Sequence, residues 1–160
     1  MNVIFFDPYL PSGYEKSLGI SRETNLSKFL EKLDILSIHS PLSSETQNIV
    51  DEKFLIKLKK NCIIINTARG QIIDKDAIYK FLKNEHISGI GFDVYPDEPP
   101  KKSDKIYKLW SSNNKKFMHK IIFTPHNAFF NEQSYIELRE KAAKTIKYFF
   151  EDKKIINQVN

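Results

Sequence analysis

The chain contains five apolar runs, and each of them ends in a turn of polar, proline or glycine residues. The runs cover residues 3–9, 34–42, 62–70, 87–99 and 120–128. Within the runs the apolar positions are continuous rather than strictly alternating, which is typical of strands that are buried on both faces of a sheet. We therefore expect five strands in a sheet that is covered on both sides.

Helical patterns separate these runs. Thr24 or Asn25 can cap one helix and Asp74 another, and the longest helical pattern covers residues 131–150. The apolar positions on one face of the first two helices are Leu26, Phe29, Leu30 and Leu33, then Ala77, Ile78, Phe81 and Leu82. Residues 99–120 break the alternation and predict a long surface connection with one helical turn. Strands that alternate with helices predict an α/β fold with a parallel sheet and right-handed crossovers.

Length and charge narrow the function classes. The 160 residues, 41% of them hydrophobic, suffice for one core but not for two full domains. The net charge of +5 comes from lysines scattered along the chain, with no run of five basic residues and no interleaving of basic and aromatic residues. We interpret this charge as a solvated surface and expect no nucleic-acid partner.

The sequence also bears on the compartment. Cys62 is the single cysteine, so the chain can form neither an internal disulfide nor a cysteine-rich metal site. No apolar run is long enough to span a bilayer, and Asp7 interrupts the first run where a signal peptide would continue. These features predict a cytoplasmic protein without a membrane partner.

Each apolar run ends at a residue that can carry chemistry. These residues are Asp7, His39, Arg69, Asp93 together with Glu98, and His126. In an open parallel sheet, ligands bind outside the carboxyl ends of the strands, so we expect a site at this edge. A structural α/β domain without a ligand would not explain the alignment.

Asp7 and His39 each have a structural explanation. An acid after the first strand can bind the adenosine ribose of a dinucleotide, but the sequence Asp-Pro also predicts a turn on its own. His39 is interpreted as hydrogen-bonded scaffolding, and we assign it no chemical role.

Arg69, Glu98 and His126 also have local explanations. Arg69 can form a salt bridge to Asp74 in a surface turn. Glu98 can belong to a solvated acidic loop, and His126 can occupy a tight turn. Together they supply three chemical groups. These are a guanidinium cation that can grip a carboxylate, an imidazole, and a carboxylate that favours the charged form of the imidazole. These groups suit the transfer of a hydride and a proton between a 2-hydroxy acid and a nicotinamide, with Arg69 holding the substrate, His126 taking the hydroxyl proton and Glu98 orienting His126.

Three motifs in this order resemble the D-isomer-specific 2-hydroxyacid dehydrogenases over nearly the whole chain. They are "DILSIHSPLSSETQNIVDEKFLIKLKKNCIIINTARGQIIDKDAI", "GFDVYPDEP" and "FTPHNAFF". The opening "VIFFDPYLPSG" and the ending from "NEQSYIELREKAA" through "NQVN" are most similar to the branch that contains the C-terminal-binding-protein corepressors and their bacterial relatives. The resemblance implies a Rossmann-type doubly wound parallel sheet, NAD as the cofactor, a small 2-hydroxy or 2-keto acid as the substrate, and a homodimer for the whole protein.

The resemblance also implies roles for single residues. Arg69, Glu98 and His126 match the catalytic arginine, glutamate and histidine, and Asp7 matches the acid that binds the ribose. The residues that border the cofactor in the matching segments are Ser40, Pro41, Leu42, Thr67, Ala68, Arg69, Asp93 and His126. The resemblance further implies that Asp93 faces the nicotinamide amide. No arginine follows Asp7 directly, and a carboxylate repels a 2′-phosphate, which favours NAD over NADP.

Two departures from the family are visible. Phe129 stands where corepressor-like members carry a tryptophan, so the substrate preference does not follow from the resemblance. No G-x-G-x-x-G motif occurs, so we expect an incomplete Rossmann-type domain that begins after the pyrophosphate loop and lacks the first strand. Residues 1–130 are predicted to form this partial NAD-binding domain, and residues 131–160 a C-terminal helix and tail that return toward a substrate domain.

The sequence therefore predicts a fragment of an NAD-dependent D-2-hydroxyacid dehydrogenase that is inactive in isolation. The alternative, from a different functional class, is an NAD-sensing interaction protein of the corepressor kind with vestigial catalysis. The presence of Arg69, Glu98 and His126 argues against that alternative.

Overall fold

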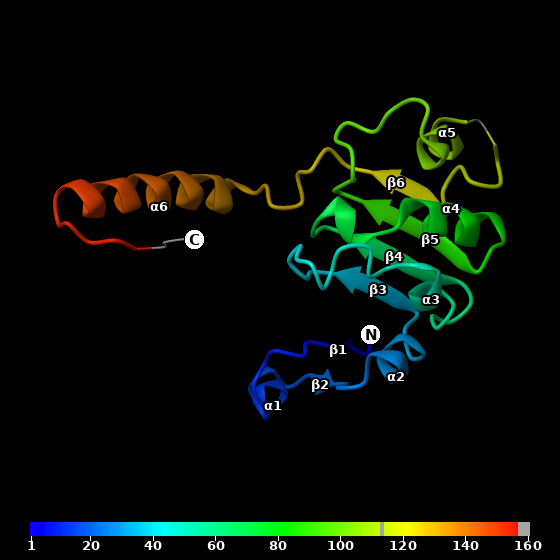
Figure 1. Ribbon diagram of the computed structural model, residues 1–160, viewed down its shortest axis with the longest axis horizontal. Coiled ribbons are helices and arrows are strands. Elements are labelled where there is room, and N and C mark those ends of the chain that lie inside the picture. The colour runs from blue at the N-terminus through cyan, green and yellow to red at the C-terminus, as the bar shows by residue number, and fades with distance from the viewer. Residues whose placement is uncertain (113, 157–160) are drawn as a thin grey trace. The chain divides into compact units, whose positions relative to one another are not determined.

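The computed structural model describes residues 1–112 and 114–156. The chain divides into two compact units at the bond between Pro125 and His126. Every strand of the described residues lies in the first unit, and the second contains the predicted long helix, α6 (Glu132–Phe150) (Figure 1). Asn131 begins α6 with a capping box, as the sequence pattern indicates. None of the described helices is long and apolar enough to cross a membrane.

Four parallel strands form the main sheet of the first unit. In their order across the sheet, these are β3 (Ile35–Ile38), β4 (Cys62–Asn66), β5 (Ile87–Phe92) and β6 (Ile121–Phe123). Each strand is joined to the next by a connection that contains a helix (Figure 1). Four of the five apolar runs therefore form one parallel sheet, which confirms the predicted α/β class.

A second, two-stranded sheet contains the first apolar run. β1 (Ile4–Phe5) pairs in parallel with β2 (Ser21–Arg22), and α1 (Tyr14–Leu18) lies between them in the chain. The sequence pattern missed β2 because a serine and an arginine form no apolar run. β1 and β3 belong to different sheets, as expected if the first strand of the Rossmann order is not among these residues.

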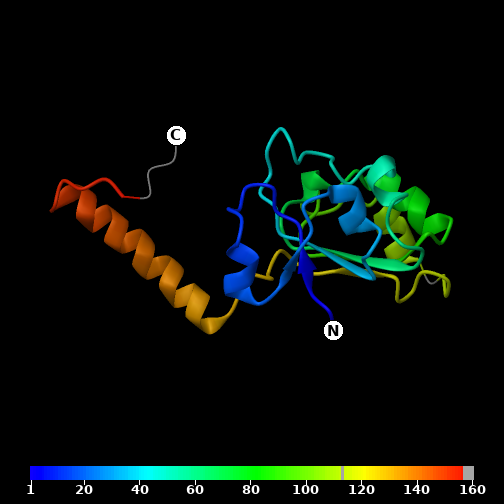
Figure 2. The same ribbon diagram turned by 90° about the horizontal axis from the view of Figure 1, so that it is seen from below.

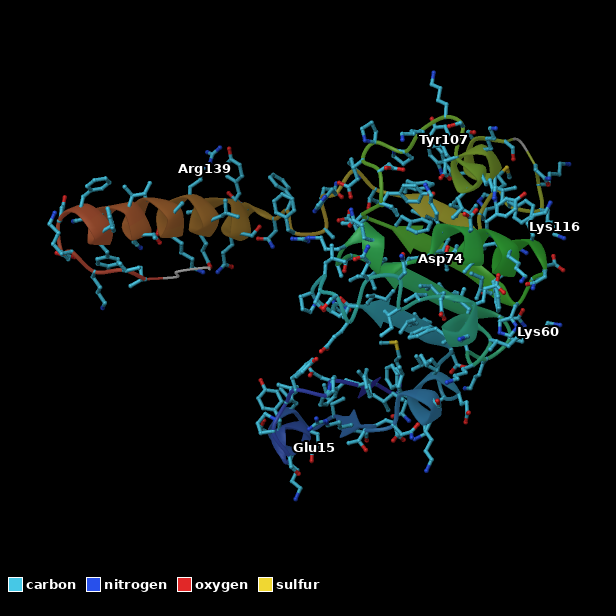
Figure 3. The ribbon with its side chains drawn as sticks, viewed as in Figure 1. Glu15, Lys60, Asp74, Tyr107, Lys116 and Arg139 are labelled. Atoms are coloured by element: carbon cyan, nitrogen blue, oxygen red, sulfur yellow. The ribbon has the colours of Figure 1, made fainter. Side chains whose placement is uncertain are left out.

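Side-chain caps begin two helices where the sequence predicts them. Asn25 accepts the backbone N–H of Lys28 at 3.0 Å and starts α2 (Leu26–Leu30), so Asn25 rather than Thr24 is the cap. Asp74, labelled in Figure 3, accepts backbone N–H groups at the start of α4 (Lys75–Lys83). The helices of the first unit that follow α1 are α2 (Leu26–Leu30), α3 (Glu52–Leu55), the 3₁₀ turn η1 (Gly70–Ile72), α4 (Lys75–Lys83) and α5 (Lys105–Ser111).

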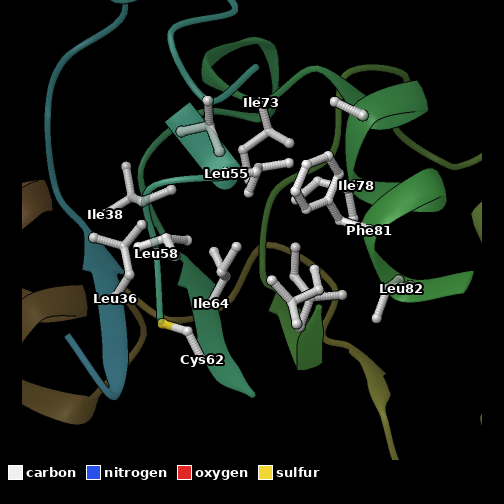
Figure 4. Close-up of a cluster of buried hydrophobic side chains, with 14 of the residues drawn as sticks. Leu36, Ile38, Leu55, Leu58, Cys62, Ile64, Ile73, Ile78, Phe81 and Leu82 are labelled. Carbon is white, nitrogen blue, oxygen red and sulfur yellow. The ribbon is translucent and has the colours of Figure 1, made fainter. Parts of the chain in front are cut away.

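The core of the first unit lies between the main sheet and the helices on one face of it (Figure 2). The predicted apolar face of α4 is buried, which confirms its 3.6-residue pattern. Figure 4 shows side chains from the sheet and the helices in this cluster, among them Leu36, Ile38, Leu55, Leu58, Cys62, Ile64, Ile73, Ile78, Phe81 and Leu82.

The opposite face of the main sheet exposes apolar side chains, so the expectation of strands buried on both faces is wrong here. Along β3, buried and exposed residues alternate. The register places Ile35 beside Ile63 on this open face, and Ile122 beside Gly91. Ile35, Ile63 and Ile122 are 52%, 39% and 60% exposed. The cause is topological, because right-handed crossovers that advance in one direction across a sheet place their helices on the same face.

We expect the 160-residue chain by itself to associate through this open face, because exposed apolar sheet surface favours pairing and aggregation. Ile63→Thr and Ile122→Thr keep β-branched side chains and should increase the monomer fraction in size-exclusion chromatography with light scattering. Ile56→Thr is the matched control, because Ile56 is 61% exposed but follows α3 instead of lying in the sheet. A monomeric wild-type chain, or an equal effect of the control substitution, would contradict this expectation.

Candidate active site

The parallel strands β3, β4 and β5 end at one edge of the main sheet, which we call the carboxyl edge. Three of the predicted segments follow these strands directly. They are Ser40, Pro41 and Leu42 after β3, then Thr67, Ala68 and Arg69 after β4, and Asp93 after β5. The fold therefore brings these segments to the same edge, and their contact with a cofactor stays a prediction.

The turn that carries Arg69 is fixed by the buried side chain of Asn66. Asn66 Oδ1 accepts the backbone N–H of Ala68 at 3.0 Å, and Asn66 Nδ2 donates to the carbonyl oxygen of Arg69 at 2.9 Å. Arg69 is exposed and donates one guanidinium N–H to the Ala68 carbonyl at 2.7 Å. A guanidinium has five N–H donors, so it keeps the capacity to grip a carboxylate. Asn66 was missed as a site residue, although an amide at the end of a buried strand is a recognisable signal.

The alternative explanation of Arg69 was a salt bridge to Asp74. Among the ion pairs of the described residues this pair does not occur, and Asp74 accepts backbone N–H groups as the cap of α4. Arg69 therefore does not lie in a turn closed by that acid.

Asp93 is a buried carboxylate at the carboxyl edge, with 7% of its surface exposed. Its backbone N–H donates to the Asn66 carbonyl at 3.0 Å, which continues the ladder between β4 and β5 by one residue. Thr124, just after β6, donates its hydroxyl to Asp93 Oδ1 at 2.5 Å. The sequence does not reveal the role of Thr124, because the two partners are separated by 31 positions and no local pattern relates them.

Glu98 is exposed in the turn after β5, and a backbone N–H group of this turn holds its carboxylate. Glu98 Oε1 accepts the backbone N–H of Tyr95 at 2.8 Å. Gln71, two residues after Arg69, donates its side-chain amide to the carbonyl oxygen of Pro96 at 3.3 Å. The turn of Glu98 and the segment that follows Arg69 are thus in direct contact.

Asp7 forms the turn that one of its two sequence interpretations predicts, and its contact with a ribose stays a prediction. Its Oδ1 accepts the backbone N–H of Tyr9 at 2.8 Å, which is the turn that Asp-Pro predicts. Arg22 donates to the carbonyl oxygens of Asp7 and Pro11 at 2.6 and 3.2 Å and holds this loop after β1. The second carboxylate oxygen gives Asp7 acceptor capacity for a ribose hydroxyl.

His39 is linked to the scaffold, because its Nε2 lies 2.8 Å from the hydroxyl oxygen of Ser37. This hydrogen bond agrees with the interpretation of His39 as a structural residue. Nearby, Thr46 donates its hydroxyl to the Pro41 carbonyl at 2.6 Å and so holds the loop after β3.

His126 belongs to the second unit, where it follows Pro125 directly. Its backbone φ of 52° lies in the left-handed region, which histidine adopts more readily than most other residues except glycine. The His126 and Phe129 rings are 6.5 Å apart between centroids and nearly perpendicular, at 79°. The common cleft that the sequence predicts for Arg69, Glu98 and His126 stays a prediction, since the first two residues belong to the other unit.

A buried carboxylate, Asp104, caps α5 and is hydrogen-bonded to the turn of Glu98. It accepts the Tyr95 hydroxyl at 2.7 Å and the backbone N–H groups of Ile106 and Tyr107 at 2.8 and 3.2 Å. Burial alone would raise the pKa of Asp104, but hydrogen bonds from Tyr95, from the backbone and from Lys75 outweigh it and lower the pKa. Burial and the bond to this carboxylate raise the pKa of Tyr95, so its hydroxyl stays protonated and donates.

Asp104→Asn should lower the free energy of unfolding at neutral pH by about 1–3 kcal/mol, because the charged hydrogen bonds are lost while asparagine can still cap the helix. Since the pKa of Asp104 is lowered in the folded chain, its contribution is present above the ordinary value of 3.8 and is lost as the pH falls through the folded value. The stabilities of the two chains should therefore converge in acid.

Urea unfolding at several pH values measures this difference, followed by the fluorescence of Trp110, the single tryptophan, which packs 5.3 Å from Phe123 between ring centroids. Asp76→Asn is the matched control, because Asp76 is 68% exposed in its ion pair with Lys105 and should contribute little. A difference between wild type and Asp104→Asn that does not change with pH would be inconsistent with the lowered pKa.

These features define a class of protein, the α/β nucleotide-binding domains, in which parallel strands present polar residues at their carboxyl ends. The family "D-isomer specific 2-hydroxyacid dehydrogenase, NAD binding domain" matches residues 1–128. The chain belongs to this family. The match confirms the predicted family, the Rossmann-type fold and NAD as the cofactor.

Known proteins are similar to this chain over most of its length. It is 32% identical over 146 residues to the glyoxylate reductase of Korarchaeum cryptofilum, a match that covers 91% of this chain and 41% of that protein. It is 34% identical over 146 residues to the D-3-phosphoglycerate dehydrogenase of Methanocaldococcus jannaschii, covering 91% of this chain and 25% of that protein.

A solved structure shows the same fold. The D-lactate dehydrogenase of Aquifex aeolicus, complexed with NAD and lactic acid, matches 93% of this chain and 46% of its own with a TM-score of 0.78 and 31% identity. The chain thus spans less than half the length of each of these three proteins.

Proposed function

We propose that the whole protein is an NAD-dependent dehydrogenase that interconverts a 2-keto acid and a D-2-hydroxy acid. The observation that carries this proposal is the contact between the segment of Arg69 and the turn of Glu98, made by Gln71 and Pro96 at the carboxyl edge. A cation for a carboxylate and an acid that can orient an imidazole thus lie on adjacent segments.

In this mechanism, Arg69 binds the substrate carboxylate through two parallel hydrogen bonds and fixes the orientation of the keto group. The bound nicotinamide supplies the hydride that reduces the keto carbon. His126 in its charged form gives a proton to the keto oxygen, and it takes the proton back in the reverse direction. Glu98 orients the imidazole for this proton transfer.

The donors and acceptors of the first unit fit NAD. Asp7 offers a carboxylate oxygen after β1, where ribose hydroxyls need an acceptor. Asp93, held by Thr124, offers a carboxylate at the carboxyl edge that suits the N–H groups of a nicotinamide amide. The loops after β3 and β4 supply the other residues proposed to border the cofactor. The Asp7 carboxylate favours NAD over NADP, because it repels a 2′-phosphate.

The proposal extends to the organisation of the whole protein. Residues 1–130 would be part of its NAD-binding domain, and residues 131–160 a helix and tail that return toward the substrate domain. Residues 157–160 of this predicted tail lie outside the described residues. The sequence similarity of residues 3–13 and 131–160 to the C-terminal-binding-protein corepressors supports a place in that branch. We propose a cytoplasmic homodimer whose partners are small acids, without nucleic acid or membrane, in keeping with its scattered lysines.

The test is an assay of the whole protein with NADH and a panel of 2-keto acids that includes glyoxylate and pyruvate. We expect NADH oxidation that depends on the keto acid, a product of D configuration when it is chiral, and slower reaction with NADPH. Chiral chromatography identifies the product. Tight NAD binding without turnover of any keto acid would contradict the proposal and favour an NAD-sensing interaction protein.

A further inference from the structure

Lys75, in the first turn of α4, joins three segments of the first unit. Its Nζ lies 3.3 Å from Asp97 Oδ2, 3.2 Å from Asp104 Oδ2 and 5.9 Å from the centroid of the Tyr95 ring. Tyr95 and Asp97 belong to the turn that ends at Glu98, and Asp104 is the cap of α5. One cation therefore links α4, the turn of Glu98 and α5.

This arrangement differs from an ordinary surface ion pair. Only 7% of the Asp104 side chain is exposed, and the carboxylate also accepts the Tyr95 hydroxyl. Exposed pairs contribute little, because water screens the charges and two long side chains must be ordered. A buried carboxylate that loses a cation is left with uncompensated charge, so Asp104 holds Lys75 more firmly than water-exposed partners would.

The same turn also determines where the Glu98 carboxylate lies. The Tyr95 backbone N–H donates to Glu98 Oε1, while the Tyr95 hydroxyl is fixed to Asp104. Asp97, the residue next to Glu98, is fixed to Lys75. Residues 95–97 are thus anchored through two side chains while their backbone holds the carboxylate.

We propose that Lys75, Asp104 and Tyr95 are positioning residues for Glu98, which fix its turn relative to α4 and the adjoining segment of Arg69. The inference rests on the proposed function, in which Glu98 orients the catalytic histidine. The three residues act through the position of the Glu98 carboxylate and not through contact with the substrate.

Backbone amide hydrogen exchange tests the network around Lys75 and does not require enzymatic activity. Lys75→Met keeps the stem of the side chain and removes the charge. Exchange in peptides that cover residues 93–98 should become about tenfold faster, because the Tyr95 N–H loses its fixed acceptor, while peptides from β4 should keep their rate. Lys80→Met is the matched control, because Lys80 lies on the same helix and forms a 2.6 Å ion pair with Glu52 in which both side chains are more than half exposed.

Kinetics of the whole protein tests the positioning role. Lys75→Met should lower kcat for keto acid reduction by about tenfold, since a misplacement of about 1 Å can cost up to ~10²-fold, and should leave the Kd for NADH unchanged. Lys75→Arg keeps the cation and should recover most of kcat. Asp97→Asn removes only the ion pair between Lys75 and Asp97, at a side chain that is 44% exposed, and should also lower kcat.

Two results would overturn the proposal. The first is equal exchange of residues 93–98 in Lys75→Met and Lys80→Met, or equal acceleration in this turn and in β4, which would mean a general loss of stability. The second is an active protein in which Lys75→Met and Asp97→Asn both keep the wild-type kcat. A whole protein that reduces no keto acid would instead refute the proposed function, and the exchange result alone would then decide whether the network fixes the turn.

Discussion

Replacing His126 by asparagine in the whole protein is expected to lower kcat by about 10²–10⁴-fold, the usual contribution of a general acid. The Kd for NADH should change little, because the dinucleotide contacts proposed for Asp7 and Asp93 remain. Asparagine is chosen as the replacement because it readily adopts the left-handed conformation that His126 has at φ 52°, so the backbone is preserved. Its side chain cannot deliver the proton. Steady-state kinetics and calorimetry measure the two quantities.

His119→Ala is the matched control for this prediction, because His119 is exposed in the connection before β6. It should leave kcat unchanged. Arg69→Lys should act differently from His126→Asn, raising KM for the keto acid more than it lowers kcat, because a lysine cannot form the bidentate grip. A His126→Asn protein with the wild-type kcat would remove His126 from the proposed mechanism.

Gly70→Ala is expected to lower the free energy of unfolding of the chain by about 3 kcal/mol or more, a loss typical of severe overpacking. A Cβ at position 70 would lie 2.0 Å from the carbonyl carbon of Tyr95 and 2.3 Å from the nitrogen of Pro96. Both neighbours are backbone atoms and cannot rotate away, so the turn that holds Glu98 must move. Urea unfolding followed by Trp110 fluorescence measures the loss of stability.

Gly13→Ala separates this steric effect from the general cost of replacing a glycine. Gly13 has a φ of +91° and no atom within 4 Å of the added Cβ, so its substitution should cost only the conformational penalty of about 1 kcal/mol. An equal loss of stability in Gly70→Ala and Gly13→Ala would show that the close approach of the two segments is not what requires Gly70.

The helix α4 shows what local sequence determines. Its cap, Asp74, and its apolar positions are all within one ten-residue stretch, and a 3.6-residue period with a capping side chain is a property of the stretch itself. The strands β3, β4, β5 and β6 follow in the same way from continuous apolar runs, and their alternation with helices led to the parallel sheet. β2 was missed because two polar residues carry no such period.

The residues of the candidate site also divide into those that local sequence reveals and those that only the tertiary structure reveals. Arg69, Glu98 and His126 were recognised because their motifs are continuous in sequence. Asn66 contacts residues two and three positions away, so its role in the Arg69 turn was within reach of sequence reasoning. Thr124 was not, because its partner Asp93 becomes its neighbour only when β5 and β6 pair.

The sequence by itself determined the strands of the main sheet, the helices α2, α4 and α6, the family and the candidate catalytic residues, because caps, periods and motifs act over a few positions. Only the tertiary structure decided which distant side chains support the candidate catalytic residues. An example is the pair of salt bridges from Lys75 to Asp97 and Asp104. It also decided that one face of the main sheet is open. An apolar run has the same pattern whether or not a helix covers it, and the covered face follows from the direction in which right-handed crossovers advance across the sheet.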